Sequence, residues 1–299
     1  MPPVLEDPLV AERHAIAPGS IVWRRAGDAR ALLGAGTALV LQVAHPTVAA
    51  GVREHSSFER DPWGRLLRTL DYVNLLVYGG PERAVRTGRQ MRAMHQRIRG
   101  VAPDGTRYHA LEPAAYAWVH ATLAETIVGA NARFGVPLAP AEREEFWARW
   151  RDLGFLLGIR ERDLPETWAG FRAYVDATIA TELRDNDVVH TVLRSLAAPA
   201  APPLRGLPAP LWHAARRPLA AVTGLATTGL LRPEARAVLH LPWSPRDERN
   251  LHALGTVLRG TTPVLPPVVR TTGPRYLRWR AAEIERGMFA GAGRVSLDG

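Results

Sequence analysis

The sequence predicts an all-α protein, because helical patterns recur along it and strand patterns do not. Apolar residues repeat at intervals of three and four in many segments, as they do on one face of an α-helix. No alternation of apolar and polar residues persists over five residues or more, and no internal repeat has a fixed period. With 299 residues, the chain is long enough for a single large domain with its own core.

Proline, glycine and aspartate mark where the predicted helices begin and end. Asp28 and Asp61 each precede a helix, where a carboxylate accepts hydrogen bonds from free backbone N–H groups. Gly100 is expected to end one helix, with a loop over residues 101–112 behind it. A proline- and alanine-rich linker is expected at residues 197–209. The predicted helices cover residues 29–41, 63–78, 82–99, 113–134, 140–153, 165–184, 187–196, 219–231, 245–259 and 275–286.

The composition excludes several kinds of chemistry. All 38 basic residues are arginines, and cysteine is absent. Without cysteine the chain forms no disulfide, thiolate nucleophile, thiolate-held zinc site or iron–sulfur cluster. Without lysine it has neither a Schiff base nor a P-loop. Dinucleotide-binding, His-Glu-x-x-His, Gly-x-Ser-x-Gly and paired Glu-x-x-His motifs are missing as well, so a metal or cofactor must be held by His, Asp, Glu or Tyr.

The net charge of +9 does not by itself indicate a nucleic-acid partner. The arginines are scattered and usually stand near acidic residues, as Arg143 does between Glu142 and Glu144, so we expect no nucleic-acid binding. The most apolar run, residues 31–52, is interrupted by polar residues and a proline and is a poor membrane span. The N-terminus lacks an export pattern, which predicts a cytoplasmic protein and leaves peripheral membrane contact and the oligomeric state open.

Two histidines lie on helix faces that should be buried. His95 follows Met91 by four residues and precedes Ile98 by three, within the apolar stripe of its helix. His120 shares a face with Leu123 of the helix over residues 113–134. From the pattern alone, a hydrogen-bonded core histidine is the commoner explanation for each, and a metal ligand is the alternative.

Two arginines and a threonine project together from the helix over residues 63–78. Arg65, Arg68 and Thr69 stand at i, i+3 and i+4, and Tyr72 continues the same face, while the other sides of the helix are apolar. Such arginines either extend to solvent, which the spacing alone favours, or bind an anionic group. The small and polar residues of 42–58 leave room for tight helix packing or for a flat ligand.

Four stretches are specific when taken together: GDARALLGAGTALVLQVAHPTVAAGVREHSSFERDPWGRLLRTLDYVNLLVYG, MRAMHQRIRG, YHALEPAAYAWVHATLAETI and LLRPEARAVLHLPWS. They resemble the oxygenase family that contains latex clearing protein, a rubber oxygenase, and the fungal MpaB-type enzymes. The resemblance implies an all-α, globin-like core over residues 21–285, with an N-terminal extension (1–20) and a C-terminal tail (286–299). It also implies haem b and an enzyme that uses dioxygen on an apolar small-molecule or lipid-like substrate.

The resemblance assigns roles to the three projecting residues. Rubber oxygenases carry Arg-x-x-Lys-Thr on the distal side of the haem, and Arg65, Arg68 and Thr69 match it with arginine in place of lysine. Arg65 would stabilise bound dioxygen or a partially reduced oxygen anion. Thr69 would hydrogen-bond the distal oxygen, and Arg68 would do the same or pair with a haem propionate. The resemblance puts the axial histidine on the next long helix, where His95 is the nearest match; His120, on the helix over residues 113–134, is the alternative.

The remaining assignments concern the segment before that helix. Glu54 or Glu59 is expected to supply a base, as a distal-side glutamate does in rubber oxygenase. His45 and His55 are expected to line or brace the haem pocket. Two other functions are consistent with the sequence: a non-catalytic helical protein that binds haem or a hydrophobic ligand, and a helical protein of the same fold without a cofactor.

Overall fold

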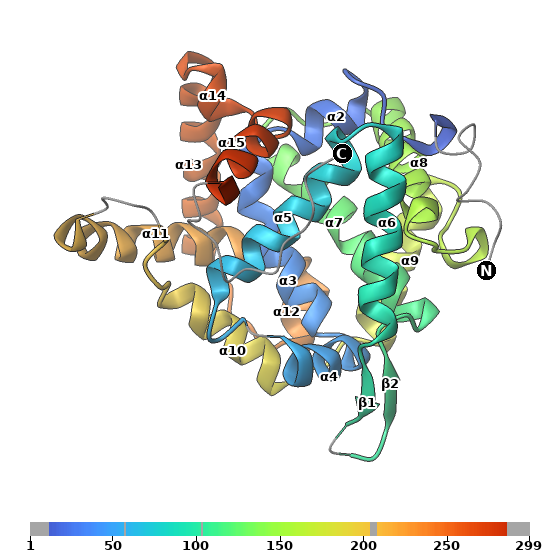
Figure 1. Ribbon diagram of the computed structural model, residues 1–299. Helices are drawn as coiled ribbons and strands as arrows, with labels where there is room; N and C mark the ends of the chain where they lie inside the picture. The colour runs from blue at the N-terminus through green and yellow to red at the C-terminus, as the bar shows by residue number, and fades with distance from the viewer. Residues whose placement is uncertain (1–11, 57, 103, 204–207, 286–299) are drawn as a thin grey trace.

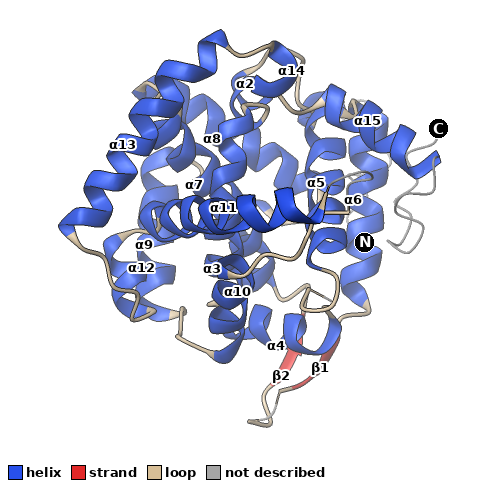
Figure 2. Ribbon diagram, turned by 90° about the vertical axis from the view of Figure 1, so that its left-hand side faces the viewer, coloured by secondary structure: helices blue, strands red, loops and turns tan. Residues whose placement is uncertain are grey.

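The computed structural model describes residues 12–56, 58–102, 104–203 and 208–285, and it confirms the all-α prediction. Helices make up almost all of its regular structure, and one short hairpin projects from them (Figure 1; Figure 2). The elements are α2 (Ile21–Ala26), η2 (Ala29–Gly34), α3 (Ala35–Val43), α4 (Pro46–His55), α5 (Pro62–Tyr78), α6 (Pro81–Gln96), β1 (Arg99–Val101), β2 (Arg107–His109), α7 (Pro113–Phe134), α8 (Pro140–Leu156), η3 (Glu161–Asp163), α9 (Trp168–Thr181), α10 (Asp187–Ala197), α11 (Ala209–Leu230), α12 (Pro233–Val238), α13 (Pro245–Thr261), η4 (Thr262–Val264), α14 (Pro267–Arg270) and α15 (Pro274–Glu285).

Helix α7 is the central element of the core. Apolar and small residues occur on all sides of it, and most of its length is buried. Trp118 on α7 is 1% exposed and donates from its indole Nε1 to the Leu41 carbonyl of α3 at 2.8 Å. Trp150 on α8 donates to the His120 carbonyl of α7 at 3.1 Å. These bonds satisfy the buried indole N–H groups and fix both neighbouring helices on α7.

The two predicted aspartate caps are confirmed. The Asp28 side chain accepts from the backbone N–H of Arg30 at 2.9 Å, and Asp61 accepts from Gly64 at 2.8 Å. The helix expected over residues 29–41 is nevertheless divided, because its first turns are the 3-10 helix η2 and only Ala35–Val43 is α-helical.

The expected helix end at Gly100 and the expected loop over residues 101–112 are wrong in part. Helix α6 ends at Gln96, and Gly100 lies in β1, which pairs antiparallel with β2 and places Gly100 opposite Tyr108. A side chain at position 100 would collide with the Tyr108 hydroxyl and the Glu54 carboxylate, which explains the glycine. Strands of three residues are too short to produce a readable alternation.

Some helices begin where the sequence pattern does not predict them. Helix α11 begins at Ala209, ten residues before the expected position, and contains Pro218. Its N-terminal half is largely exposed, so the carbonyl that this proline leaves without a helical partner can bond to water. Helix α4 occupies part of the segment for which tight packing or a flat ligand was expected. Residues 204–207 of the expected linker lie outside the described residues.

The described residues contain no single helix that is long and apolar enough to cross a membrane. Within the described part of the chain, one pair of helical segments, residues 29–43 and 46–55, reaches that length and hydropathy when taken together, and the two segments are bent by 103°. The domain boundaries expected at residues 20 and 285 remain predictions, since residues 1–11 and 286–299 lie outside the described structure.

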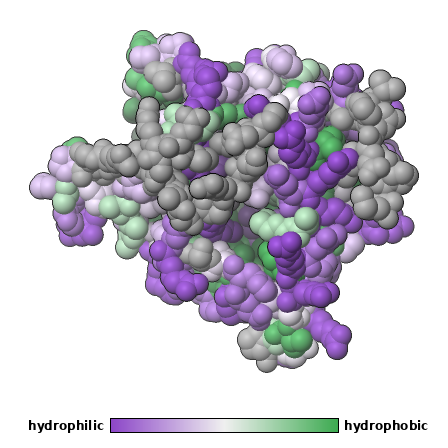
Figure 3. Space-filling view, viewed as in Figure 1, coloured by the Kyte–Doolittle hydropathy of each residue, from purple (hydrophilic) through white to green (hydrophobic). Residues whose placement is uncertain are grey.

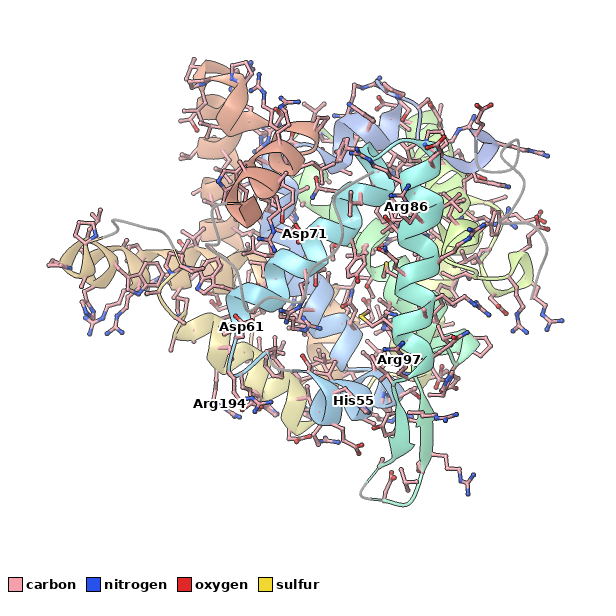
Figure 4. All side chains as sticks on the ribbon, viewed as in Figure 1. His55, Asp61, Asp71, Arg86, Arg97 and Arg194 are labelled. Atoms are coloured by element: carbon pink, nitrogen blue, oxygen red, sulfur yellow. The ribbon has the colours of Figure 1, made fainter. Side chains whose placement is uncertain are left out.

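A buried ion pair joins the C-terminal helix α15 to α5. Arg280 donates from Nε to both carboxylate oxygens of Asp71 at 3.0 Å, and the two side chains are only 3% and 2% exposed. The Tyr276 hydroxyl donates to Asp71 at 2.7 Å and also lies 3.2 Å from the Leu67 carbonyl oxygen. Burial, followed by the charge of Asp71, raises the pKa of Tyr276, so this hydroxyl stays protonated as a donor. Figure 4 shows Asp71 on the side of α5 that faces α15.

We expect Arg280→Met to destabilise the protein strongly, because it leaves the Asp71 carboxylate buried without its cation. Breaking a buried ion pair from one side typically costs about 3–5 kcal/mol of the free energy of unfolding. Urea denaturation of wild type and variant measures the difference. The double variant Asp71→Asn/Arg280→Met removes both charges and should recover a large part of that loss; an Arg280→Met protein as stable as wild type would contradict the prediction.

Candidate functional site

A cavity of about 780 Å³ lies between α4, α5, α6, α7 and α8. This volume lies within the range of about 300–1,000 Å³ that is typical of small-molecule and cofactor sites. Its lining is mostly apolar, with a small number of cationic and imidazole groups. Six of the residues that the sequence analysis proposed for the site line this cavity: His55, Arg65, Arg68, Thr69, His95 and His120. His45, Glu54 and the alternative Glu59 do not line it.

Arg65 and Arg68 stand one turn apart on α5, so they share one face of the helix. Both residues line the cavity. Arg68 pairs with Asp61, the residue that caps the helix, at 3.5 Å. Thr69 donates from its hydroxyl to the Arg65 carbonyl at 3.0 Å. Burial, and then the neighbouring charge of Arg68, lower the pKa of Arg65, but a guanidinium starts so high that it stays charged. Among the described residues no carboxylate pairs with Arg65, so its charge is available to a ligand in the cavity.

His95 lies across the cavity on α6 with one ring nitrogen engaged. Its Nδ1 lies 2.7 Å from the Met91 carbonyl, and a carbonyl oxygen can only accept, so Nδ1 carries the proton. The ring packs edge-on against Tyr116 at 5.5 Å between centroids. Burial lowers the pKa of His95, and the bond to Met91 opposes this only in part. The imidazole is therefore neutral near pH 7, and because no described residue bonds to Nε2, the lone pair of this nitrogen could bind a metal.

His120 is engaged in a different way. Its Nε2 donates to the Trp150 carbonyl at 2.8 Å, and its ring stacks on the Trp150 indole at 5.4 Å. Burial lowers the pKa of His120 to about 4. A side chain at Gly154 would touch this ring, so α8 approaches it closely. His120 thus joins α7 to α8 through the nitrogen that His95 keeps free.

His55 stands at the end of α4 in a chain of hydrogen bonds. The Tyr108 hydroxyl of β2 donates to the Glu54 carboxylate, and the His55 Nε2 lies 3.1 Å from the same hydroxyl. Because that hydroxyl has one proton and gives it to Glu54, His55 Nε2 is the donor in the second bond. Burial and the Glu54 carboxylate raise the pKa of Tyr108 to about 12. Glu54 is exposed beside the cavity, while His55 borders it.

His45 lies outside the cavity at the N-cap of α4. Its side chain is 5% exposed, and its Nδ1 has no partner among the described residues. Burial lowers the pKa of His45, with Glu112 and Glu182 acting in the opposite direction.

Two further polar residues of the cavity follow from the structure. The helical pattern predicts that Arg97 lies on the outer face of its helix. In the structure α6 ends at Gln96, and Arg97 lines the cavity. Figure 4 shows Arg97 and His55 near one another at the same end of the space between α4 and α6. Tyr116 on α7 lines the cavity and supports the ring of His95. Tyr116 was not singled out as a site residue from the sequence, where it lies within the stretch YHALEPAAYAWVHATLAETI.

The chain matches the family described as "ER-bound oxygenase mpaB/B'/Rubber oxygenase, catalytic domain" over residues 23–260. This span contains every residue of the cavity. Two uncharacterized proteins, from Mycobacterium bovis and Mycobacterium tuberculosis, are each 28% identical to the chain over 237 residues, which is 76% of this chain and 87% of theirs. No solved structure matches significantly.

His120 should make the protein less stable in mild acid. Its pKa is about 4 when folded against a reference value of 6.5, so between these two values the unfolded chain binds a proton that the folded protein does not. Stability from this residue is therefore complete above the higher value and decreases as the pH falls toward the lower one, by on the order of 3 kcal/mol.

Urea denaturation over this pH range should show a smaller decrease in His120→Gln than in wild type. His252→Gln, a change at an exposed histidine of α13, serves as the control and should keep the wild-type dependence. Identical pH profiles for wild type and His120→Gln would contradict the prediction.

Proposed function

Because the chain belongs to the family of the ER-bound oxygenase mpaB and rubber oxygenase, we propose that it is a haem-b-dependent oxygenase that uses dioxygen on an apolar small molecule. The observation that carries the proposal is the state of His95. This residue is neutral, lines the cavity and keeps Nε2 free.

The residues around the cavity fit a haem. One histidine with a free nitrogen is enough, because the porphyrin itself supplies the other iron ligands. Apolar side chains from α5, α6 and α7 match the flat macrocycle, and Arg68 and Arg97 offer cations for its propionates. Among the described residues, no group of three or more His, Asp or Glu side chains could hold a metal ion by itself. A haem site does not require such a group.

When bound, haem b supplies an iron centre that activates dioxygen for transfer to the substrate. The chain's own residues would bind and orient the cofactor and the substrate and would exclude water from the cavity. His95 would hold the iron from α6, with its ring orientation set by the Met91 carbonyl and by Tyr116. Arg65 would stabilise negative charge that develops in the cavity, and it acts strongly there because its charge is partly desolvated.

The remaining polar groups would adjust this environment. Thr69 lines the cavity next to Arg65, and its hydroxyl can rotate from the Arg65 carbonyl to a ligand. The hydrogen-bonded chain of Glu54, Tyr108 and His55 connects an exposed carboxylate with the cavity wall and could carry a proton between them. Apolar residues such as Val73, Leu76 and Leu123 would keep water from the substrate.

The optical spectrum of the purified protein tests the proposal. Wild type, as isolated or after addition of haemin, should show a Soret band. His95→Ala should lose haem or bind it at least about tenfold more weakly, because a coordinate bond is missing, and added imidazole should restore the band. His252→Ala is the control. A colourless wild type that does not take up haemin would overturn the proposal; a Soret band without oxygen consumption on any apolar substrate would favour a non-catalytic haem protein.

Arg65→Met should weaken the binding of azide to the ferric haem protein. Loss of one charge-assisted hydrogen bond reduces affinity by about 10–100-fold, since such bonds contribute about 1.5–3 kcal/mol. Spectroscopic titration with azide measures this. Arg83→Met, on the exposed side of α6, should titrate like wild type. Equal azide affinities in wild type and Arg65→Met would show that Arg65 does not act on a ligand of the cavity.

A further inference from the structure

The net positive charge of the protein comes entirely from the C-terminal part of its sequence. Residues 1–187 contain 23 arginines and 23 acidic residues, so that part is neutral. Residues 188–299 contain 15 arginines and 6 acidic residues, which accounts for the whole net charge of +9. The span 188–233 contains no acidic residue at all. In the second part arginines therefore outnumber acidic residues, although Arg232 and Arg280 pair with acidic residues of the first part.

Exposed apolar side chains are also concentrated in this part of the chain. Of the large hydrophobic residues that are exposed, most belong to α11 and to the elements after it. Leu211 and Leu219 on α11 are 58% and 41% exposed. At the junction of α13, η4 and α14, Val264 is 82% exposed, and Val257 and Val269 are 59% and 54% exposed. Val264 is thus almost as accessible as in an unfolded chain.

The N-terminal half of α11 projects from the body of the protein (Figure 1). Leu211, Leu219 and Val222 stand at i, i+8 and i+11, so they form one apolar stripe along this helix. Arg216 and Arg217 lie outside the stripe and are exposed, and no carboxylate pairs with them among the described residues. Figure 3 shows hydrophobic and hydrophilic atoms next to each other on this projection.

The α11 projection and the α13–α14 junction lie on one side of the molecule. In Figure 1 they form its left and upper left edge, and in Figure 2, which views that edge directly, α11, α13 and α14 are all visible. We call this the C-terminal surface and define it by Leu211, Arg216, Arg217, Leu219, Val257, Val264 and Val269.

We propose that the C-terminal surface binds the headgroup region of an anionic phospholipid bilayer. Exposed aliphatic side chains beside arginines are the combination with which peripheral proteins enter the interface of a membrane. The charge asymmetry supplies the attraction to acidic lipids, and the aliphatic side chains then insert below the phosphates. This inference goes beyond the proposed function and does not depend on the cofactor.

A nucleic acid is the less suitable occupant. Proteins that bind single strands interleave aromatic residues with basic ones so that bases stack on them. The apolar residues that define the C-terminal surface are valine and leucine, which offer no flat face to a base but partition well into lipid. Charge alone would be consistent with both partners, and the aliphatic side chains favour the membrane.

Co-sedimentation with vesicles tests the proposal. Wild type should bind vesicles of phosphatidylcholine and phosphatidylglycerol and should bind pure phosphatidylcholine vesicles much more weakly. Binding should fall steeply toward about 1 M salt, where the screening length is only about 3 Å. Arg216→Gln/Arg217→Gln should weaken binding to the acidic vesicles about fivefold for each arginine removed. Leu211→Ser/Val264→Ser should weaken binding as well, with the salt dependence retained.

Matched controls use residues of the neutral part of the chain. Arg83→Gln/Arg162→Gln removes two exposed arginines, and Val101→Ser/Val136→Ser removes two exposed valines that are each 56% exposed. Both controls should bind acidic vesicles like wild type. All of these changes lie at the surface, so thermal unfolding should show that every variant is folded.

Three outcomes would overturn the proposal: equal binding of wild type to neutral and acidic vesicles, equal loss in the control and the C-terminal variants, or displacement of the protein from acidic vesicles by a stoichiometric amount of RNA. Self-association of wild type that Leu211→Ser/Val264→Ser abolishes, without vesicle binding, would assign the surface to a second copy of the chain instead.

Discussion

The site depends on holding a cationic helix face against an apolar cavity. Helix α5 is apolar on most of its sides, yet it turns Arg65, Arg68 and Thr69 toward the space that α6 and α7 enclose. Asp61 caps the first turn of this helix and pairs with Arg68 within it. Asp71, which does not line the cavity, holds α5 to α15 through the buried ion pair with Arg280.

The second determinant of the site is the hydrogen bond that each histidine makes. His95 and His120 both lie on inward helix faces, and both are held neutral by burial. They differ in which nitrogen is engaged. Met91 takes the Nδ1 proton of His95, whereas Trp150 takes the Nε2 proton of His120. The first arrangement leaves Nε2 of His95 without a partner among the described residues, and the second joins two helices of the core.

The C-terminal third of the chain makes a buried contact with the core and also forms an exposed surface. Helix α15 supports α5 through a buried ion pair, and α11 and the α13–α14 junction present arginines and aliphatic side chains to the outside. The family match ends at residue 260, so α14 and α15 lie beyond it.

The sequence by itself determined the fold class, most helix positions and the face on which Arg65, Arg68 and Thr69 lie, because helix periodicity and capping are local. It also placed His95 and His120 on inward faces. Only the tertiary structure decided between their ring nitrogens, removed His45 and Glu54 from the cavity lining, and brought Arg97 to it. It decided as well that Asp71 meets Arg280, 209 positions away along the chain. Hydrogen-bond partners of this kind come from helices distant in sequence, and local patterns contain no information about which helices will pack together.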